Sequence, residues 1–272
     1  MNKGAFGLAL LACAIPLVPG ATAPRPPLQP IKAWTLDYGE TACTAIRTYG
    51  SSEAPITLAF RPSPNGTVVR AVVIRPGRAS DAYHFDLNAE LGATSVKTTG
   101  LHFGSTDHKS TVVWINFRRE QLEGFRRSTT FTLHGGGDVD GSFALPGMAT
   151  ILDRLDECNA DLRKYWNTGD GAPPLSKPAT PLKPLAAYFS DRDYPDQAIH
   201  DHAAGLSGVM LMVDETGKLK DCLVEKTSGI ASLDAMTCYV LLERARFDPA
   251  LDVARKPVKS VLTTAVKWKM GA

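Results

Sequence analysis

The sequence predicts an α+β protein with two folded domains, a β-rich domain followed by a smaller mixed one. Short runs of β-branched and aromatic residues, separated by turn-forming residues, fill much of positions 31–166. This pattern is typical of an antiparallel barrel-like or sandwich-like domain. A Pro- and Gly-rich linker at 167–184 cannot bury a core, and positions 185–272 then mix helical and strand patterns.

The amino-terminal residues are typical of a secretory signal peptide. A short positive start precedes an apolar run to about Val18, and small residues and prolines follow it; this order marks a segment that is removed on export. The run is also too short to span a bilayer. We therefore expect residues 1–23 to be cleaved, after Ala23 or after Gly20, and the protein to work in the periplasm. Lipid anchoring at Cys13 is the lesser alternative.

Charge and cysteine content narrow the classes of function. The formal net charge is +2, with both signs spread along the chain, so nucleic acid is not an expected partner. Export favours disulfides. Loss of the leader would remove Cys13 and leave four of the five cysteines, which allow three pairings.

The front domain is expected to consist of strands closed by a helix. The strand patterns fall at 41–49, 55–61, 67–75, 111–117 and 128–134. The helix is expected over 147–166, where an apolar stripe at helical spacing comprises Ile151, Leu152, Leu155, Cys158 and Leu162. Because Cys158 lies on this stripe and Cys43 in an early strand, we predict a Cys43–Cys158 disulfide. Closing so long a loop contributes roughly 4–5 kcal/mol at most in the chain-entropy model.

The back domain is expected to follow the order helix, strand, strand, helix, strand. A helix is predicted over 194–205, and two strands over 207–227 about a turn at 214–217. A second helix is predicted over 232–247, with Ser232 as its N-cap. The last strand, at 257–270, alternates apolar residues with lysines, which is typical of a half-buried strand.

A set of residues in a fixed order gives the back domain a family resemblance. The set comprises Tyr194, Pro195, Gly208, Asp214, Gly217, Ser228, Gly229, Leu233, Asp234, Phe247 and Pro249. With these residues on these elements, about the last third of the chain resembles the TonB C-terminal domain family. The resemblance implies a three-stranded antiparallel sheet, and it extends to a cysteine-bearing branch of the family.

In that branch Cys222 and Cys238 are expected to form a disulfide. Cys222 falls in the second strand and Cys238 in the following helix, and a helix packed on its own sheet brings such residues within bridging range. A metal site would need further ligands nearby, and a redox pair would favour Cys-x-x-Cys. Both are lesser alternatives.

The resemblance also implies the function of an energy transducer in transmembrane transport. The partner would be an outer-membrane TonB-dependent receptor, whose TonB-box peptide adds as a strand beside the last strand of the domain. An inner-membrane proton-channel complex is a further implied partner. The edge that receives the peptide would comprise Lys259, Val261, Leu262, Thr263, Thr264, Ala265 and Lys267. A capped edge, or an edge used for a homodimer, is the alternative.

The sequence departs from the family in several places. Ala245 stands where the family often carries Trp, and no Gly precedes Lys256-Pro257. Family transducers also keep a membrane helix and a long Pro-rich linker, whereas here the leader is expected to be removed and the linker is short. A non-transport envelope protein-binding module is therefore the alternative function.

No catalytic, metal or cofactor site is predicted. The stretch Leu-His-Gly-Gly-Gly-Asp at 133–138 is similar to an esterase oxyanion loop, but that role requires a Gly-x-Ser-x-Gly nucleophile. A glycine-rich hairpin loop is the preferred interpretation. A hydrolase in the front domain that uses His134 or Asp138 is the second alternative.

Overall fold

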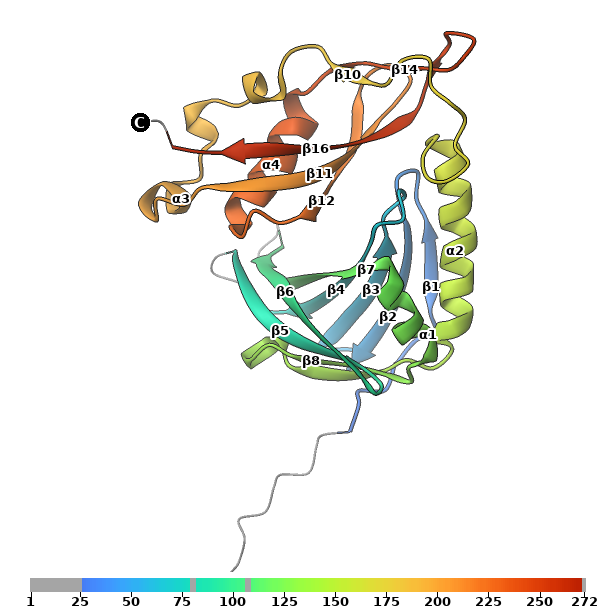
Figure 1. The fold of residues 1–272 in the computed structure, drawn as a ribbon. Helices are drawn as coiled ribbons and strands as arrows, with labels where there is room; N and C mark the ends of the chain where they lie inside the picture. The colour runs from blue at the N-terminus through green and yellow to red at the C-terminus, as the bar shows by residue number, and fades with distance from the viewer. Residues whose placement is uncertain (1–25, 79–81, 106–108, 271–272) are drawn as a thin grey trace, which may run out of the picture.

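The structure is a computed structural model that describes residues 26–78, 82–105 and 109–270. The expected signal peptide and Cys13 lie outside the described residues. Figure 1 shows a large curled antiparallel sheet with a long helix against it, and a smaller domain of sheet and helices above. In the described part of the chain no helix is long and apolar enough to cross a membrane.

The front domain is a nine-stranded antiparallel sheet in the order β1-β2-β3-β4-β7-β6-β5-β8-β9. Its strands are β1 (Thr35–Tyr38), β2 (Cys43–Gly50), β3 (Pro55–Pro62), β4 (Val68–Pro76), β5 (Tyr83–Leu91), β6 (Thr94–Gly104), β7 (Ser110–Arg118), β8 (Thr130–His134) and β9 (Gly141–Ala144). A barrel-like or sandwich-like arrangement was the expectation, and a single curled sheet is what the chain forms.

The segment just before β1 links the two ends of this sheet. The Leu28 N–H donates to the Ser142 carbonyl oxygen at 2.7 Å, beside β9, while the Ile31 N–H donates to the Thr48 carbonyl oxygen in β2 at 2.9 Å. Backbone groups near both edges of the sheet are thereby hydrogen-bonded. Paired edges protect a sheet from the addition of strands from other molecules.

Aromatic rings fill the inside of the curl. Phe60 and Phe117 lie 4.9 and 5.1 Å from the buried ring of Phe125, which belongs to α1 (Leu122–Arg127). Helix α2 (Met148–Tyr165) covers the open side and buries Met148, Leu152, Leu155 and Leu162. The short 3-10 turns η1 (Arg119–Gln121) and η2 (Gly137–Val139) complete this domain.

Strands β5 and β6 were not expected from the sequence. Leu87, Ala89 and Leu91 of β5 are buried, but polar residues alternate with them in β5 and make up most of the first half of β6. Few apolar residues are therefore available to indicate a strand. The hairpin is held by pairing with β8 on one side and β7 on the other.

The back domain has the expected element order. Helix α3 (Asp196–His200), strands β11 (Gly205–Val213) and β12 (Leu219–Lys226), helix α4 (Ala231–Arg244) and strand β16 (Ser260–Trp268) form a three-stranded sheet in the order β12-β11-β16, with α4 against it. Helix α3 is shorter than predicted and ends five residues before Gly205. Short elements frame the domain: η3 (Leu185–Tyr188), η4 (Asp191–Asp193), β13 (Phe247–Asp248), β14 (Ala250–Leu251) and β15 (Pro257–Val258).

The Pro-rich segment 167–184 lies against the back domain. Strand β10 (Thr180–Pro181) pairs with β13, and Lys177 forms a bridge with Leu251. Its Pro- and Gly-rich composition led us to expect an extended linker that cannot bury a core, but Ala179 is buried in the back-domain core and Leu175 packs against it. The part of this segment that pairs is therefore fixed to the domain that follows it.

Strand β11 is buried on both faces. Val209, Leu211 and Val213 pack in the core beneath α4. Met210 and Met212 face the other way and belong to the same buried cluster as the front-domain core. The two domains therefore share a continuous apolar contact across the sheet of the back domain.

Candidate functional site

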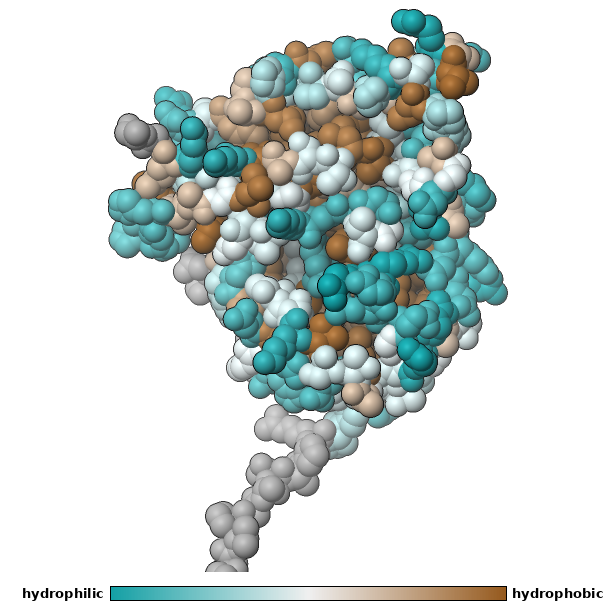
Figure 2. Space-filling model, in the orientation of Figure 1, coloured by the Kyte–Doolittle hydropathy of each residue, from teal (hydrophilic) through white to brown (hydrophobic). Residues whose placement is uncertain are grey.

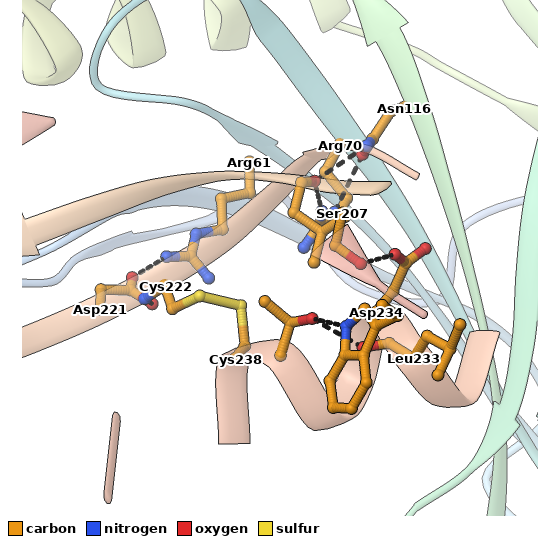
Figure 3. The surroundings of a disulfide bond; sticks show 12 residues. Arg61, Arg70, Asn116, Ser207, Asp221, Cys222, Leu233, Asp234 and Cys238 are labelled. Atoms are coloured by element: carbon orange, nitrogen blue, oxygen red, sulfur yellow. Dashed lines mark hydrogen bonds and ion pairs between the residues drawn. A yellow bond between two sulfur atoms is a disulfide. The ribbon is translucent and has the colours of Figure 1, made fainter. Parts of the chain in front are cut away.

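Both predicted disulfides are present. Cys222 in β12 bonds to Cys238 in α4, with 5.4 Å between their Cα atoms (Figure 3). Cys43 in β2 bonds to Cys158 in α2, with 6.2 Å between Cα atoms. Each bond ties a helix to the sheet that the helix covers.

The two edges of the back-domain sheet differ. The β12 edge faces the front domain, where the Val224 carbonyl oxygen accepts hydrogen bonds from Arg70 at 2.7 Å and Asn116 at 3.3 Å. Next to it, the side chains of Asn65 and Thr67 both donate to Glu225 at 2.7 Å. Arg61 forms an ion pair with Asp221 on the same strand (Figure 3). This edge is therefore closed.

The β16 edge is the open one. On one side β16 pairs with β11 from Ser260 to Trp268, and no other strand in the described ranges pairs with its second side. Leu262, Val266 and Trp268 pack into the core under α4, whereas Thr263, Ala265 and Lys267 are exposed. The front half of the chain leaves this rim uncovered over most of the predicted binding edge.

The beginning of the predicted edge is occupied by the chain itself. The Asn167 side chain donates to the Lys259 carbonyl oxygen at 2.9 Å. The Lys259 ammonium group bonds to Glu215 at 2.6 Å and lies 4.8 Å from the centre of the Tyr165 ring. The hydrogen bond to Glu215 raises the pKa of Lys259. Lys259 therefore anchors the strand, and the free rim is Val261 to Lys267.

A hollow with a volume of about 440 Å³ lies beside the second half of β16. Its wall includes Phe189 and Tyr194, whose rings meet the Trp268 ring edge-on at 5.2 and 5.3 Å. Ala265 and Lys267 form the strand side. Apolar residues gather on the upper part of the face shown in Figure 2, over the back domain. The hollow can therefore take an apolar side chain from a segment that lies along β16.

The family-motif residues mostly fix the fold rather than line this rim. Asp214 accepts hydrogen bonds from the N–H groups of Thr216 and Lys218, both at 2.9 Å, and so closes the β11–β12 turn. Gly217 has φ +80°, and the Phe247 carbonyl oxygen would lie 1.9 Å from a Cβ at this position. No other residue fits there. Pro195 precedes α3, and Tyr194 donates to the Ala203 carbonyl oxygen at 2.5 Å.

Asp234 is a buried hub in α4. Its carboxylate accepts from Ser207 at 2.6 Å, Thr227 at 2.5 Å and the Ser228 N–H at 2.9 Å. Nε2 of His84, in the front domain, lies 3.3 Å from the same carboxylate. Burial alone would raise the pKa of Asp234, but the hydrogen bonds from His84, Ser207, Thr227 and Ser228 hold it below its ordinary value.

Sequence reasoning did not foresee the contact between the domains. His84 had no recognisable pattern in the sequence, because its partners are far along the chain. Arg70 did leave a signal, since a charged residue inside an apolar strand pattern needs a partner. That signal does not tell which residue the partner is.

The loop considered as an esterase motif has another role. The N–H groups of Gly135 and Gly136 both donate to Asp140 Oδ1 at 2.8 Å, so the loop closes on its own aspartate. His134 is exposed and lies 3.4 Å from Glu90, and the side chain of Asp138 lies outside the described residues. Within the described ranges, no group of three His, Cys, Asp or Glu side chains could hold a metal ion.

A sheet with one face under a helix, one closed edge and one open edge defines a domain able to accept a further strand. Residues 190–270 match the family of the Gram-negative bacterial TonB protein C-terminal domain. The match covers the back domain and confirms the resemblance that the motif residues indicated. A domain of this family is an envelope module that interacts with outer-membrane receptors in general. No curated protein matches the chain.

Proposed function

We propose that this chain is a TonB-like periplasmic protein that binds a receptor peptide by strand addition at β16. The observation that carries the proposal is the open rim from Val261 to Lys267, beside a sheet whose other edge is closed by the front domain. Main-chain hydrogen bonds would supply most of the affinity, and the hollow next to Ala265 would select one apolar side chain.

The front domain acts in this proposal as a rigid support. It holds β12 through the Arg70 and Asn116 hydrogen bonds and through the Arg61–Asp221 ion pair. Only the β16 edge is therefore available to a guest strand, and the register of the back-domain sheet stays fixed when the guest strand binds. The partner we infer is the TonB box of an outer-membrane receptor, in energy-coupled transport. We assign the chain no reaction and no cofactor.

Calorimetric titration with TonB-box peptides from the receptors of the same cell tests the proposal. The matched control is the same peptide with N-methylated amides, because it keeps the side chains but cannot donate backbone hydrogen bonds. We expect binding of the first and none of the second. If no receptor peptide binds while both disulfides are intact, the proposal is wrong. Self-association that depends on protein concentration would show that a second copy uses this edge.

One observation favours a second candidate, a binding module without energy coupling. The segment 167–184 is paired to the back domain at β10 and Lys177, so this part of it is not a free tether that could transmit a pull. Deletion of the gene for the inner-membrane proton channel discriminates the two functions. Receptor-dependent uptake that requires both this protein and the channel supports transport, whereas capture of a partner without the channel supports the module.

A further inference from the structure

A second site lies between the two domains, away from the β16 rim. It is a cavity with a volume of about 570 Å³ between the outer face of the front sheet and the β12–α4 pair. Pockets for small molecules commonly measure about 300–1,000 Å³. Leu101, Phe103 and Trp114 form its front-domain wall, and Val224, Ala231 and the Cys222–Cys238 disulfide form its back-domain wall.

The polar end of the cavity holds a buried cation. Arg70 is 5 % exposed, and its guanidinium group lies 4.4 Å from the centre of the Trp114 ring. Its protein partners are neutral, namely Asn116 Oδ1 at 3.0 Å and the Val224 carbonyl oxygen at 2.7 Å. Burial, with the nearby charge of Arg61, lowers the pKa of Arg70 to about 9, so the group remains charged at neutral pH.

The carboxylates around this cation have other partners. Arg70 lies directly opposite Arg61 on neighbouring strands, an arrangement that destabilises a sheet unless anions compensate it. Asp221 pairs with Arg61, Glu225 accepts from Asn65 and Thr67, and Asp234 accepts from its own four donors. Among the described residues, none forms an ion pair with Arg70. Lys226 also lines the cavity, together with the carboxylates of Glu225 and Asp234, whose partners are given above.

We propose that this cavity binds a small amphipathic molecule with one anionic head group and an apolar body. The head group would lie at Arg70, and the apolar body would follow Leu101, Phe103 and the disulfide toward α4. A carboxylate on an alkyl chain is complementary to a buried guanidinium group beside an apolar wall. The carboxylate would form a charge-assisted hydrogen bond with the guanidinium group, and the alkyl chain would pack against the apolar wall. This site is independent of the peptide edge.

Calorimetric titration of the full chain with three probes of equal chain length tests the proposal. The probes are decanoate, decanol and decyltrimethylammonium, each below its micellar concentration. We expect decanoate to bind at least tenfold more tightly than decanol, and the cation not to bind. Equal affinity for all three, or no binding of decanoate, would overturn the proposal.

Two variants locate the site. Ala235 is exposed and lines the cavity, so Ala235→Trp should fill it and abolish decanoate binding, whereas Ala235→Ser should leave binding unchanged. Arg70→Met should remove the preference for decanoate over decanol. Because Arg70 also bonds to Val224, the thermal unfolding of the Arg70→Met variant is measured as well. If that variant does not fold, the result for Ala235→Trp decides the outcome. Unchanged decanoate affinity in Ala235→Trp would contradict the assignment.

Discussion

Arg70 of the front sheet donates a hydrogen bond to the main-chain carbonyl oxygen of Val224, at 2.7 Å. A side chain thus occupies a position on the β12 edge where a neighbouring strand would otherwise bond. Asn116 shares the same acceptor. The consequence is an asymmetric sheet, closed at β12 by the first half of the chain and open at β16.

The Arg61–Asp221 pair should couple the two domains energetically. Both side chains are largely shielded, at 27 and 17 % exposure, so the pair is less screened than a surface pair. A double-mutant cycle with Arg61→Ala and Asp221→Ala, measured by urea unfolding, should give a coupling free energy of about 1 kcal/mol. The same cycle on the exposed Lys164–Asp161 pair is the control and should give less than about 0.5 kcal/mol. Equal values would show that this contact does not hold the domains.

The Cys222–Cys238 bond should stabilise the back domain. The bond spans 16 residues, and a loop of this size corresponds to about 3 kcal/mol in the chain-entropy model. The double variant Cys222→Ser/Cys238→Ser should lower the free energy of unfolding by an amount of this order. Cys43→Ser/Cys158→Ser, which opens a span of 115 residues, should cost more. A back domain as stable without its bond as with it would contradict the prediction.

Gly217 should tolerate no side chain. Its φ of +80° disfavours other residues, and the Phe247 carbonyl oxygen occupies the place of a Cβ. Gly217→Ala should therefore cost more than the backbone strain alone, which is about 1–2 kcal/mol. Gly66→Ala is the matched control, because Gly66 has φ +79° but no atom within 4 Å of its Cβ position. Chemical denaturation of both variants separates strain from collision, and equal losses would exclude the collision.

The stability of the protein should fall in acid partly through Asp234. Its pKa is lowered in the folded protein, whereas the unfolded value is about 3.9. Its contribution is therefore fully present above about pH 4 and is lost as the pH falls through the folded pKa. The denaturation midpoint of Asp234→Asn should be lower than that of the unaltered protein at pH 6, and should change less between pH 6 and 2.

Asp193 provides the comparison for this pH dependence. Its pKa is lowered chiefly by the two hydrogen bonds from Arg244, and it lies away from the contact between the domains. Asp193→Asn should also reduce the loss of stability between pH 6 and 2, but it should leave the contact between Asp234 and His84 intact. If the stability of Asp234→Asn depended on pH in the same way as that of the unaltered protein, the charge of Asp234 would make no contribution to the pH dependence of stability.

The back domain could be predicted because its signals are local. The helix and strand periods, the Asp214–Gly217 turn and the alternating last strand each depend on neighbours in sequence. The Cys222–Cys238 pairing was implied by the family resemblance, and the predicted strand and helix agreed with it. The front sheet was predicted less fully. Strands β5 and β6 carry many polar residues and are defined by their partner strands, which include β7 and β8 farther along the chain.

The relation between the domains could not be predicted from local patterns. The run from Val209 to Val213 is apolar at every position, which is typical of a strand buried on both faces, but the sequence does not show that the cover over Met210 and Met212 is the front domain. The His84–Asp234 contact joins residues 150 positions apart. Such contacts depend on tertiary packing, which a single sequence does not display.

The most direct test of the central claim is a pair of prolines in β16. Successive residues of a strand direct their N–H groups to opposite edges, so Thr263→Pro and Thr264→Pro differ in the bond that they remove. One of the two variants loses a backbone hydrogen bond to β11, and the other variant loses only an N–H donor at the open rim. Denaturant unfolding identifies the rim variant as the more stable of the two. We predict that this variant loses receptor-peptide binding in calorimetry while its fold is retained. Binding of the peptide with unchanged affinity by the rim variant would contradict strand addition at β16.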